Sequence, residues 1–172
     1  KPVPHRSRLL AALGDARSGV RGVLDSADVR STAGLLRALG VSVPALTGDM
    51  HIDGVGLQGL RAPTSVIDCG NSGTTARLSS GILAACPFTS RLTGDESLSR
   101  RPMHRIARPL EAMGARVEFE RGDGLPLSIT GGPLRSIEWE TEAASAQVKG
   151  AILLAGLVAS VPVAVCVPAR SR

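Results

Sequence analysis

The spacing of apolar residues switches between a helical and an alternating period, and the same switch occurs twice. Residues 35–43 (LLRALGVSV) and 109–117 (PLEAMGARV) share Leu, Ala, an apolar residue, Gly and Val in register. Their offset, from Gly40 to Gly114, is 114 − 40 = 74 residues. Glycine after the last helical turn is the usual left-handed cap. Each copy therefore predicts an amphipathic helix that ends at glycine and continues into a strand.

A polar turn, an apolar helix and a strand also recur three times along the chain. The helix and strand pairs are 3–13 with 18–24, 71–83 with 90–94, and 145–157 with 161–167. After the second helix of a unit the pattern predicts paired strands, such as 115–120 and 125–130, with Asp123 and Gly124 as the hairpin turn. These elements predict an α/β (α+β) chain of repeated units.

We place unit one at about 1–66, unit two at about 67–135 and a partial unit three at about 136–172. The third copy contains only its first helix and strand. A repeat array cut inside a unit leaves an apolar face uncovered, so we expect a chain that is incomplete at its C-terminus. The functional-looking motif at the N-terminus suggests a loss there as well.

Composition narrows the class of protein. Hydrophobic residues make up 43% of the chain, with two Phe, one Trp and no Tyr, so the core must be aliphatic. The net charge of +5 favours anionic partners. Nucleic acid is disfavoured because base stacking uses aromatic side chains and the arginines are spread singly. Small phosphorylated ligands fit this distribution better.

Residues 150–169 carry no charge and are long enough to span a bilayer. Pro162 interrupts them, and the valines that follow occupy alternate positions. This pattern predicts a helix that ends near Ala159 and a buried strand, with no membrane span.

The three cysteines, Cys69, Cys86 and Cys166, are widely spaced and odd in number, which predicts buried free thiols in a reducing compartment. No N-terminal signal peptide is visible, so we expect a cytoplasmic location.

The stretch DCGNSGTTARLSSG (68–81) concentrates hydrogen-bonding groups and little bulk. Asn71 and Ser72 are candidate N-caps, and Gly70 and Gly73 allow a ligand to approach the backbone. The free N–H groups at a helix N-terminus attract anions. An ordinary capped helix is the alternative that composition alone leaves open, because neither a Walker GK[ST] sequence nor GxGxxG is present.

A basic stretch lies at 93–114 (TGDESLSRRPMHRIARPLEAMG). Pro102 marks the first turn of a predicted helix, and Arg101 just before it can clamp a carboxylate or phosphate bidentately. We expect Arg105 and Arg108 on a solvated helix face. We expect His104 on the surface rather than on a metal, because no partner lies at ligand spacing.

Two further helix starts carry polar groups. At the N-terminus, Lys1 and Arg6 flank a proline-stiffened turn. In 142–156, Ser145 caps a helix whose first turn holds Gln147 and Lys149, and a lysine there opposes the helix dipole unless an anion is near. If the repeats stack about a pseudo-threefold axis, these starts converge on one surface for a multiply anionic ligand.

Three motifs, DCGNSGTTARLSSG, GDESLSRRPMHRIARPLEAMGA and ASAQVKGAILLAGL, resemble the 3-phosphoshikimate 1-carboxyvinyltransferase (5-enolpyruvylshikimate-3-phosphate synthase) family, as does DVRSTAGLLRALGV. The resemblance implies two domains of three βαβαββ units about a pseudo-threefold axis, one domain being absent here. It implies enolpyruvyl transfer from phosphoenolpyruvate to the 5-hydroxyl of shikimate 3-phosphate with loss of phosphate. It implies no cofactor or metal and a monomeric full-length enzyme.

Carried over residue by residue, the resemblance assigns two overlapping sets of contacts. The shikimate 3-phosphate set is Lys1, Arg6, Ser145 and Gln147. The phosphoenolpyruvate set is Lys1, Asn71, Gly73, Arg101 and Gln147. No catalytic residue is assigned in this chain, because the family's acid and base groups lie in the other domain.

This chain departs from the family at its start, where Lys-Ser-x-Ser-x-Arg is usual and Pro2 and Pro4 stand here. Pro2 lacks the hydroxyl and the N–H donor, which puts the shikimate 3-phosphate contact in doubt. Two alternatives stay open: a non-catalytic phosphate-binding or scaffold fragment, and the related UDP-N-acetylglucosamine carboxyvinyltransferase.

Overall fold

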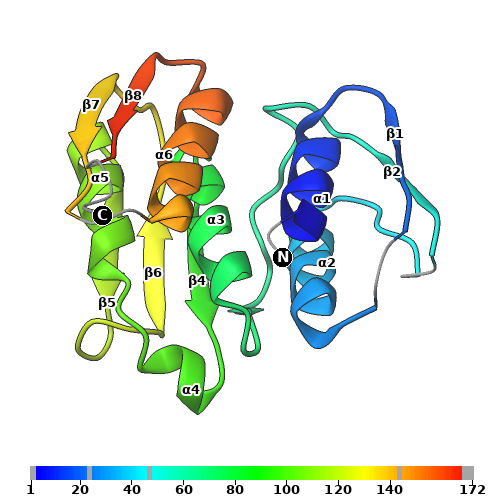
Figure 1. The fold of residues 1–172 in the computed structure, drawn as a ribbon, viewed down its shortest axis with the longest axis horizontal. Helices are drawn as coiled ribbons and strands as arrows, with labels where there is room; N and C mark the ends of the chain where they lie inside the picture. The colour runs from blue at the N-terminus through cyan, green and yellow to red at the C-terminus, as the bar shows by residue number, and fades with distance from the viewer. Residues whose placement is uncertain (1–2, 23–24, 46–47, 143–144, 168–172) are drawn as a thin grey trace, which may run out of the picture.

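A computed structural model of the chain describes residues 3–22, 25–45, 48–142 and 145–167 (Figure 1). Helices and strands alternate along much of the chain, so the predicted mixed α/β class is confirmed. The elements in chain order are α1 (Val3–Leu13), β1 (Arg17–Val20), α2 (Ala27–Ala38), β2 (Met50–Asp53), β3 (Ile67–Asp68), α3 (Gly73–Ala84), β4 (Thr89–Thr93), α4 (Glu96–Ser99), α5 (His104–Met113), β5 (Arg116–Phe119), β6 (Leu127–Thr130), β7 (Ile137–Glu140), α6 (Ala146–Ala159) and β8 (Val163–Cys166).

The described strands form three small sheets. β1 and β2 pair antiparallel, β7 and β8 pair parallel, and the middle sheet has the order β3-β4-β6-β5. In the middle sheet β3 and β4 are parallel, whereas β6 is antiparallel to both of its neighbours. With α3 and α5, the middle sheet has the βαβαββ order, with the short α4 inserted before α5. The boundaries of the three units stay a prediction.

Helices α3 and α6 lie side by side in the core, and two glycines set how closely they approach (Figure 1). A Cβ added at Gly81 of α3 would stand 2.0 Å from the carbonyl oxygen of Ala151 of α6. A Cβ at Gly150 of α6 would stand 2.7 Å from Leu78 Cδ2. Gly81 therefore allows the two helix backbones to approach closely, and Gly150 leaves room for the Leu78 side chain between them.

A chain of buried polar side chains joins α1, α2 and the start of α3. His5 Nδ1 is hydrogen-bonded to Thr32 Oγ1 (2.7 Å), and Thr32 Oγ1 to Thr75 Oγ1 (2.7 Å). Thr75 Oγ1 donates to Ser72 Oγ (2.8 Å). All four residues are buried, and a buried polar group left without a partner is costly. This series of buried hydrogen bonds therefore fixes the N-terminus of α3 against the first two helices.

Several local predictions are confirmed. Gly114 ends α5 in the left-handed region (φ 119°), and Gly40 after α2 also has positive φ (86°). Helix α6 ends at Ala159, as expected. None of the described helices is both long and apolar enough to cross a membrane. Burial raises the pKa of the Cys69 thiol to about 12, which suits an inert core cysteine.

Three sequence predictions are wrong: the burial of the last strand, the burial of Cys166 and a strand at 41–43. The last strand, β8, is half-exposed rather than buried, and Cys166 on it is exposed. The predicted strand at 41–43 is not assigned as one: Val41 and Val43 are buried and Ser42 is exposed, which is strand-like, but among the described residues this segment joins no sheet ladder.

The turn around Asp123 and the start of α5 also differ from the prediction. Strand β5 ends at Phe119 and β6 begins at Leu127, so their connection is longer than a two-residue hairpin. The Asp123 carboxylate instead accepts hydrogen bonds from the N–H groups of Met103 (2.9 Å) and His104 (2.6 Å). Because this carboxylate satisfies the first free N–H groups, α5 begins at His104, and Pro102 precedes the helix.

We predict that Gly81→Ala destabilises the chain, because the new methyl group overlaps the backbone of α6. Overpacking of this kind costs about 1–3 kcal/mol. Gly34→Ala on the exposed face of α2 is the matched control, since a Cβ there meets nothing within 4 Å. The control should gain up to about 1 kcal/mol from helix propensity. Urea unfolding of both variants checks this, and equal stabilities would contradict the close helix contact.

We predict a pH dependence that arises from His5. Burial lowers the pKa of His5, the Asp28 carboxylate raises it and the Arg8 guanidinium lowers it, and the net direction is downward. The unfolded chain therefore binds this proton at higher pH than the folded chain, so stability should fall as pH drops through about 6.5. Urea midpoints at about pH 7.5 and about pH 5.5 should differ less in His5→Asn. An unchanged difference in this variant would contradict the assignment.

Candidate anion-binding site

Two neighbouring residues before α3 have different roles, because one caps the helix and the other contacts the basic segment after β4. Ser72, rather than Asn71, is the N-cap, and its Oγ accepts from the N–H of Thr75 (3.2 Å). The side chain of Asn71 is thereby free to reach outward. Its Oδ1 accepts from Arg101 Nη2 (2.7 Å), and its Nδ2 donates to Asp95 Oδ2 (2.6 Å). Asn71 thus joins the loop before α3 to the basic segment after β4.

Asp95 fixes the orientation of this amide. It is the N-cap of α4, where its Oδ1 accepts from the Leu98 N–H (2.7 Å). Hydrogen bonds from Asn71 and then from Leu98 lower the pKa of the Asp95 carboxyl. Because the ionised carboxylate accepts the Asn71 amide hydrogen, Asn71 must turn its carbonyl oxygen toward Arg101. The guanidinium of Arg101 also donates to Ser97 Oγ (3.3 Å).

Gly73 lies between two guanidinium groups. A Cβ at this position would stand 3.1 Å from Arg77 Nη1 and 3.4 Å from Arg101 Nη1. A side chain there would crowd both cations and cover the helix N-terminus. Gly73 itself is buried, and its N–H donates to the Asn71 carbonyl oxygen (3.1 Å), so its predicted role as an open approach to backbone N–H groups stays a prediction.

The first turn of α6 meets the first turn of α3. Ser145 caps α6, as predicted, by accepting from the Val148 N–H (3.4 Å). Gln147 bridges the two helices: its Oε1 accepts from Arg77 Nη1 (2.7 Å), and its Nε2 donates to Thr74 Oγ1 (3.1 Å). This bridge brings Gln147 to the Gly73 end of α3.

Arg77 is the residue of this site that sequence reasoning missed. Burial lowers the pKa of Arg77, and the nearby charges of Arg105 and Arg101 lower it further. Its Nε is buried and has no hydrogen-bond partner among the described residues. A usable signal was present, because an arginine one turn inside a helix N-terminus opposes the helix dipole and is favourable only beside acceptors or an anion.

Arg6 reaches the same end of α6 from α1. Its Nη2 donates to the carbonyl oxygen of Ala146 (3.3 Å) and lies 3.6 Å from the position of a Cβ on Gly150. Lys1, which also belongs to the predicted contacts, and Pro2, where the chain departs from the family, lie outside the described residues.

The predicted contacts within the described part of the chain are therefore close together. Asn71, Gly73, Arg101 and Gln147 form one connected group, and Ser145 and Arg6 lie at the adjoining start of α6. The arginines of the connected group donate to neutral amide, hydroxyl and carbonyl oxygens. A surface of this kind can hold an anion, because its positive charge is not cancelled.

Across the described ranges no group of three or more His, Cys, Asp and Glu side chains is placed to hold a metal ion. His104 lies on the surface, as expected, where its ring stacks on Phe119 (4.2 Å between centroids) and is hydrogen-bonded to Asp123 (2.5 Å).

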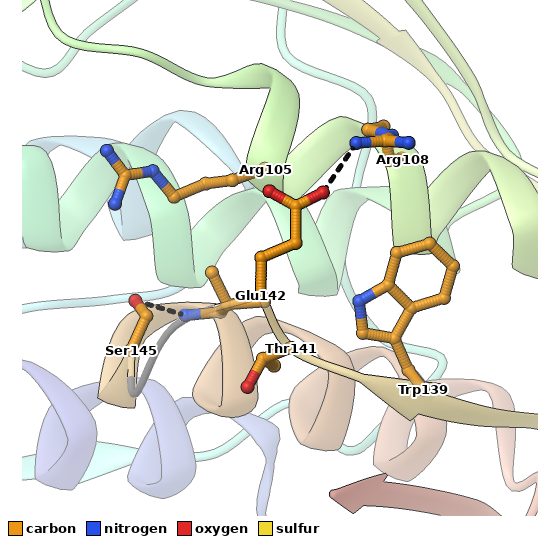
Figure 2. A pocket seen from close by; sticks show the side chains of 7 residues that line it. Arg105, Arg108, Trp139, Thr141, Glu142 and Ser145 are labelled. Atoms are coloured by element: carbon orange, nitrogen blue, oxygen red, sulfur yellow. Dashed lines mark hydrogen bonds and ion pairs between the residues drawn. The ribbon is translucent and has the colours of Figure 1, made fainter. Parts of the chain in front are cut away.

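A pocket adjoins this surface at the N-terminus of α6 (Figure 2). It shares Ser145 with the predicted site. Its remaining lining comes from α5, from β7 and the residues after it, and from α6: Arg105, Arg108, Trp139, Thr141, Glu142 and Val148.

Comparison with known proteins agrees with this geometry. The family model described as EPSP synthase (3-phosphoshikimate 1-carboxyvinyltransferase) matches residues 1–169. The 3-phosphoshikimate 1-carboxyvinyltransferases of Acidithiobacillus ferrooxidans and Geobacillus kaustophilus are each 48% identical to all of this chain, which covers 40% of each relative. A solved EPSP synthase from Acinetobacter baumannii superposes with a TM-score of 0.91 at 44% identity, over 100% of this chain and 39% of that one.

The chain thus spans about 40% of the length of the curated relatives that it matches. The matched family is that of 3-phosphoshikimate 1-carboxyvinyltransferase, the branch that the stretches GDESLSRRPM and SAQVK favour over the UDP-N-acetylglucosamine branch. Since the family model covers nearly every residue and a solved member shares the fold, this chain belongs to the EPSP synthase (3-phosphoshikimate 1-carboxyvinyltransferase) family.

Proposed function

We propose that this chain supplies one wall of the substrate cleft of an enolpyruvyl transferase. The reaction moves the enolpyruvyl group of phosphoenolpyruvate to the 5-hydroxyl of shikimate 3-phosphate and releases phosphate. The observation that carries the proposal is the connected group of Arg101, Gly73, Arg77 and Gln147. Family membership supports the choice of substrates.

The charge of the two substrates explains what the wall has to do. Each substrate carries one phosphate and one carboxylate, and the transfer requires the two molecules to lie in contact. Cations and N–H groups must offset the repulsion between these anions, and their fixed positions keep the reacting atoms aligned. Guanidinium groups held by neutral partners keep their full charge for this purpose.

We assign phosphoenolpyruvate to the surface around Gly73, with Asn71 and Arg101 on one side and Gln147 on the other. We assign shikimate 3-phosphate to Ser145, Gln147 and Arg6, with Lys1 contributing to both ligands. Arg77 acts through Gln147, because its hydrogen bond to Oε1 sets the direction of that amide.

Proton transfer to the methylene carbon of phosphoenolpyruvate requires acid and base groups. We assign these groups to protein outside this chain, as the family resemblance implies. On this proposal the chain binds both substrates weakly and does not turn them over by itself. We expect it to work in the cytoplasm with small anionic metabolites as its ligands.

We predict that Arg101→Gln weakens binding of phosphoenolpyruvate by the chain on the order of tenfold or more, because a charge-assisted bidentate contact is lost. Arg100→Gln is the matched control, since this neighbouring side chain is exposed and pairs with Glu96. Calorimetric titration at millimolar ligand measures both variants. Equal loss in the two variants would show a general charge effect, and no detectable binding by wild type would favour the inert fragment.

We predict that Arg6→Gln separates the two ligands. The side chain of Arg6, on α1, contacts the first residue of α6 and lies away from the contacts between Asn71 and Arg101. Its removal should therefore weaken shikimate 3-phosphate about tenfold and leave phosphoenolpyruvate within about twofold. The same titrations report both affinities. A parallel loss for both ligands would contradict the assignment of Arg6 to one of them.

A further inference from the structure

The pocket beside Ser145 contains two arginines in different electrostatic states (Figure 2). Arg108 Nη1 donates to Glu142 Oε1 (2.8 Å), so its charge is balanced by a carboxylate. Arg105, one turn earlier on α5, forms no hydrogen bond or ion pair within the described part of the chain. Its exposed position agrees with the expectation of a solvated face, but its side chain lines the pocket wall.

Arg105 also belongs to the cation cluster of the candidate site. Its charge acts on Arg77, whose Nη1 is bonded to Gln147, and Arg101 acts on Arg77 as well. In the described ranges no carboxylate lies within ion-pairing distance of Arg77, Arg101 or Arg105. Like charges gathered without an ion-pair partner are unfavourable in the free protein, and a bound anion relieves the repulsion.

The close view shows where such an anion has room. The guanidinium of Arg105 and the hydroxyl of Ser145 lie on the same side of Glu142, whereas Arg108 and the Trp139 indole lie on the other side (Figure 2). Ser145 is the cap of α6, two residues before Gln147. The open side of the pocket thus continues toward the candidate site through Ser145.

We propose that Arg105 is a further substrate-binding residue, which holds the phosphate monoester of shikimate 3-phosphate against Ser145 in this pocket. The proposal rests on the proposed function and identifies the group that the pocket receives. A guanidinium fork matches two phosphate oxygens, and the serine hydroxyl can donate to a third. Glu142 keeps Arg108 out of this contact, so Arg105 is the cation that selects for the phosphorylated ligand.

The chain carries its own probe for this pocket. Trp139 is the only tryptophan and the chain has no tyrosine, so tryptophan emission reports on the pocket alone. Shikimate 3-phosphate and inorganic phosphate should change this emission in a saturable way, whereas unphosphorylated shikimate at the same concentration should not. Arg105→Gln should weaken both responses on the order of tenfold, and Arg105→Lys should retain part of the affinity through its charge. Arg100→Gln should match wild type.

The outcomes separate this proposal from the proposed function. If calorimetry shows shikimate 3-phosphate binding that Arg6→Gln weakens but Arg105→Gln does not, the role of Arg105 is overturned and the function stands. Binding without any change in Trp139 emission overturns the pocket as the phosphate position. If wild type binds neither substrate by calorimetry, the proposed function itself fails and this proposal fails with it.

Discussion

The close contact between α3 and α6 is the constraint on which the rest of the site depends. Gly81 allows the two helix backbones to approach at a spacing that a side chain there would forbid, and Gly150 leaves room for the Leu78 side chain. Because the helices lie together, their first turns meet, and Gln147 can bridge Thr74 and Arg77. The geometry of the candidate site therefore depends first on how the two helix backbones pack. Gly81, which lies in the core, determines where the polar side chains at the helix N-termini meet.

Charge is then arranged on this frame so that it stays uncompensated. Asp95 comes nearest to neutralising the site, since its charge interacts with that of Arg101, but its oxygens are hydrogen-bonded to the Asn71 amide and to the first turn of α4 and form no ion pair with the arginine. The side chains of Ser72, Thr75 and His5 are engaged in the buried series of hydrogen bonds through Thr32, which holds the loop before α3 in place. The arginines keep neutral partners, and this difference distinguishes them from paired surface arginines such as Arg91 with Glu120. An anionic ligand is the partner that such a surface lacks.

Local signals were sufficient for the elements and for part of the site. The glycine at Gly114, the caps at Ser72 and Ser145 and the position of Arg101 all follow from neighbours within a few residues of sequence, and the structure contains them. What the sequence did not reveal depends on distant partners. Asp123 resembled a hairpin turn because its real contact, the start of α5, is twenty residues away. Arg77 resembled an ordinary helical residue because Gln147 is seventy residues away. The half-exposure of β8 likewise depends on what packs against it.

The most direct test of the account is backbone-amide NMR of the chain during titration with phosphoenolpyruvate. The account predicts that the amides of 72–75, of Arg101 and of 146–148 shift together and saturate with one dissociation constant, since they belong to one surface. Amide shifts confined to one of these segments, or segments that saturate at different ligand concentrations, would contradict a shared anion-binding site.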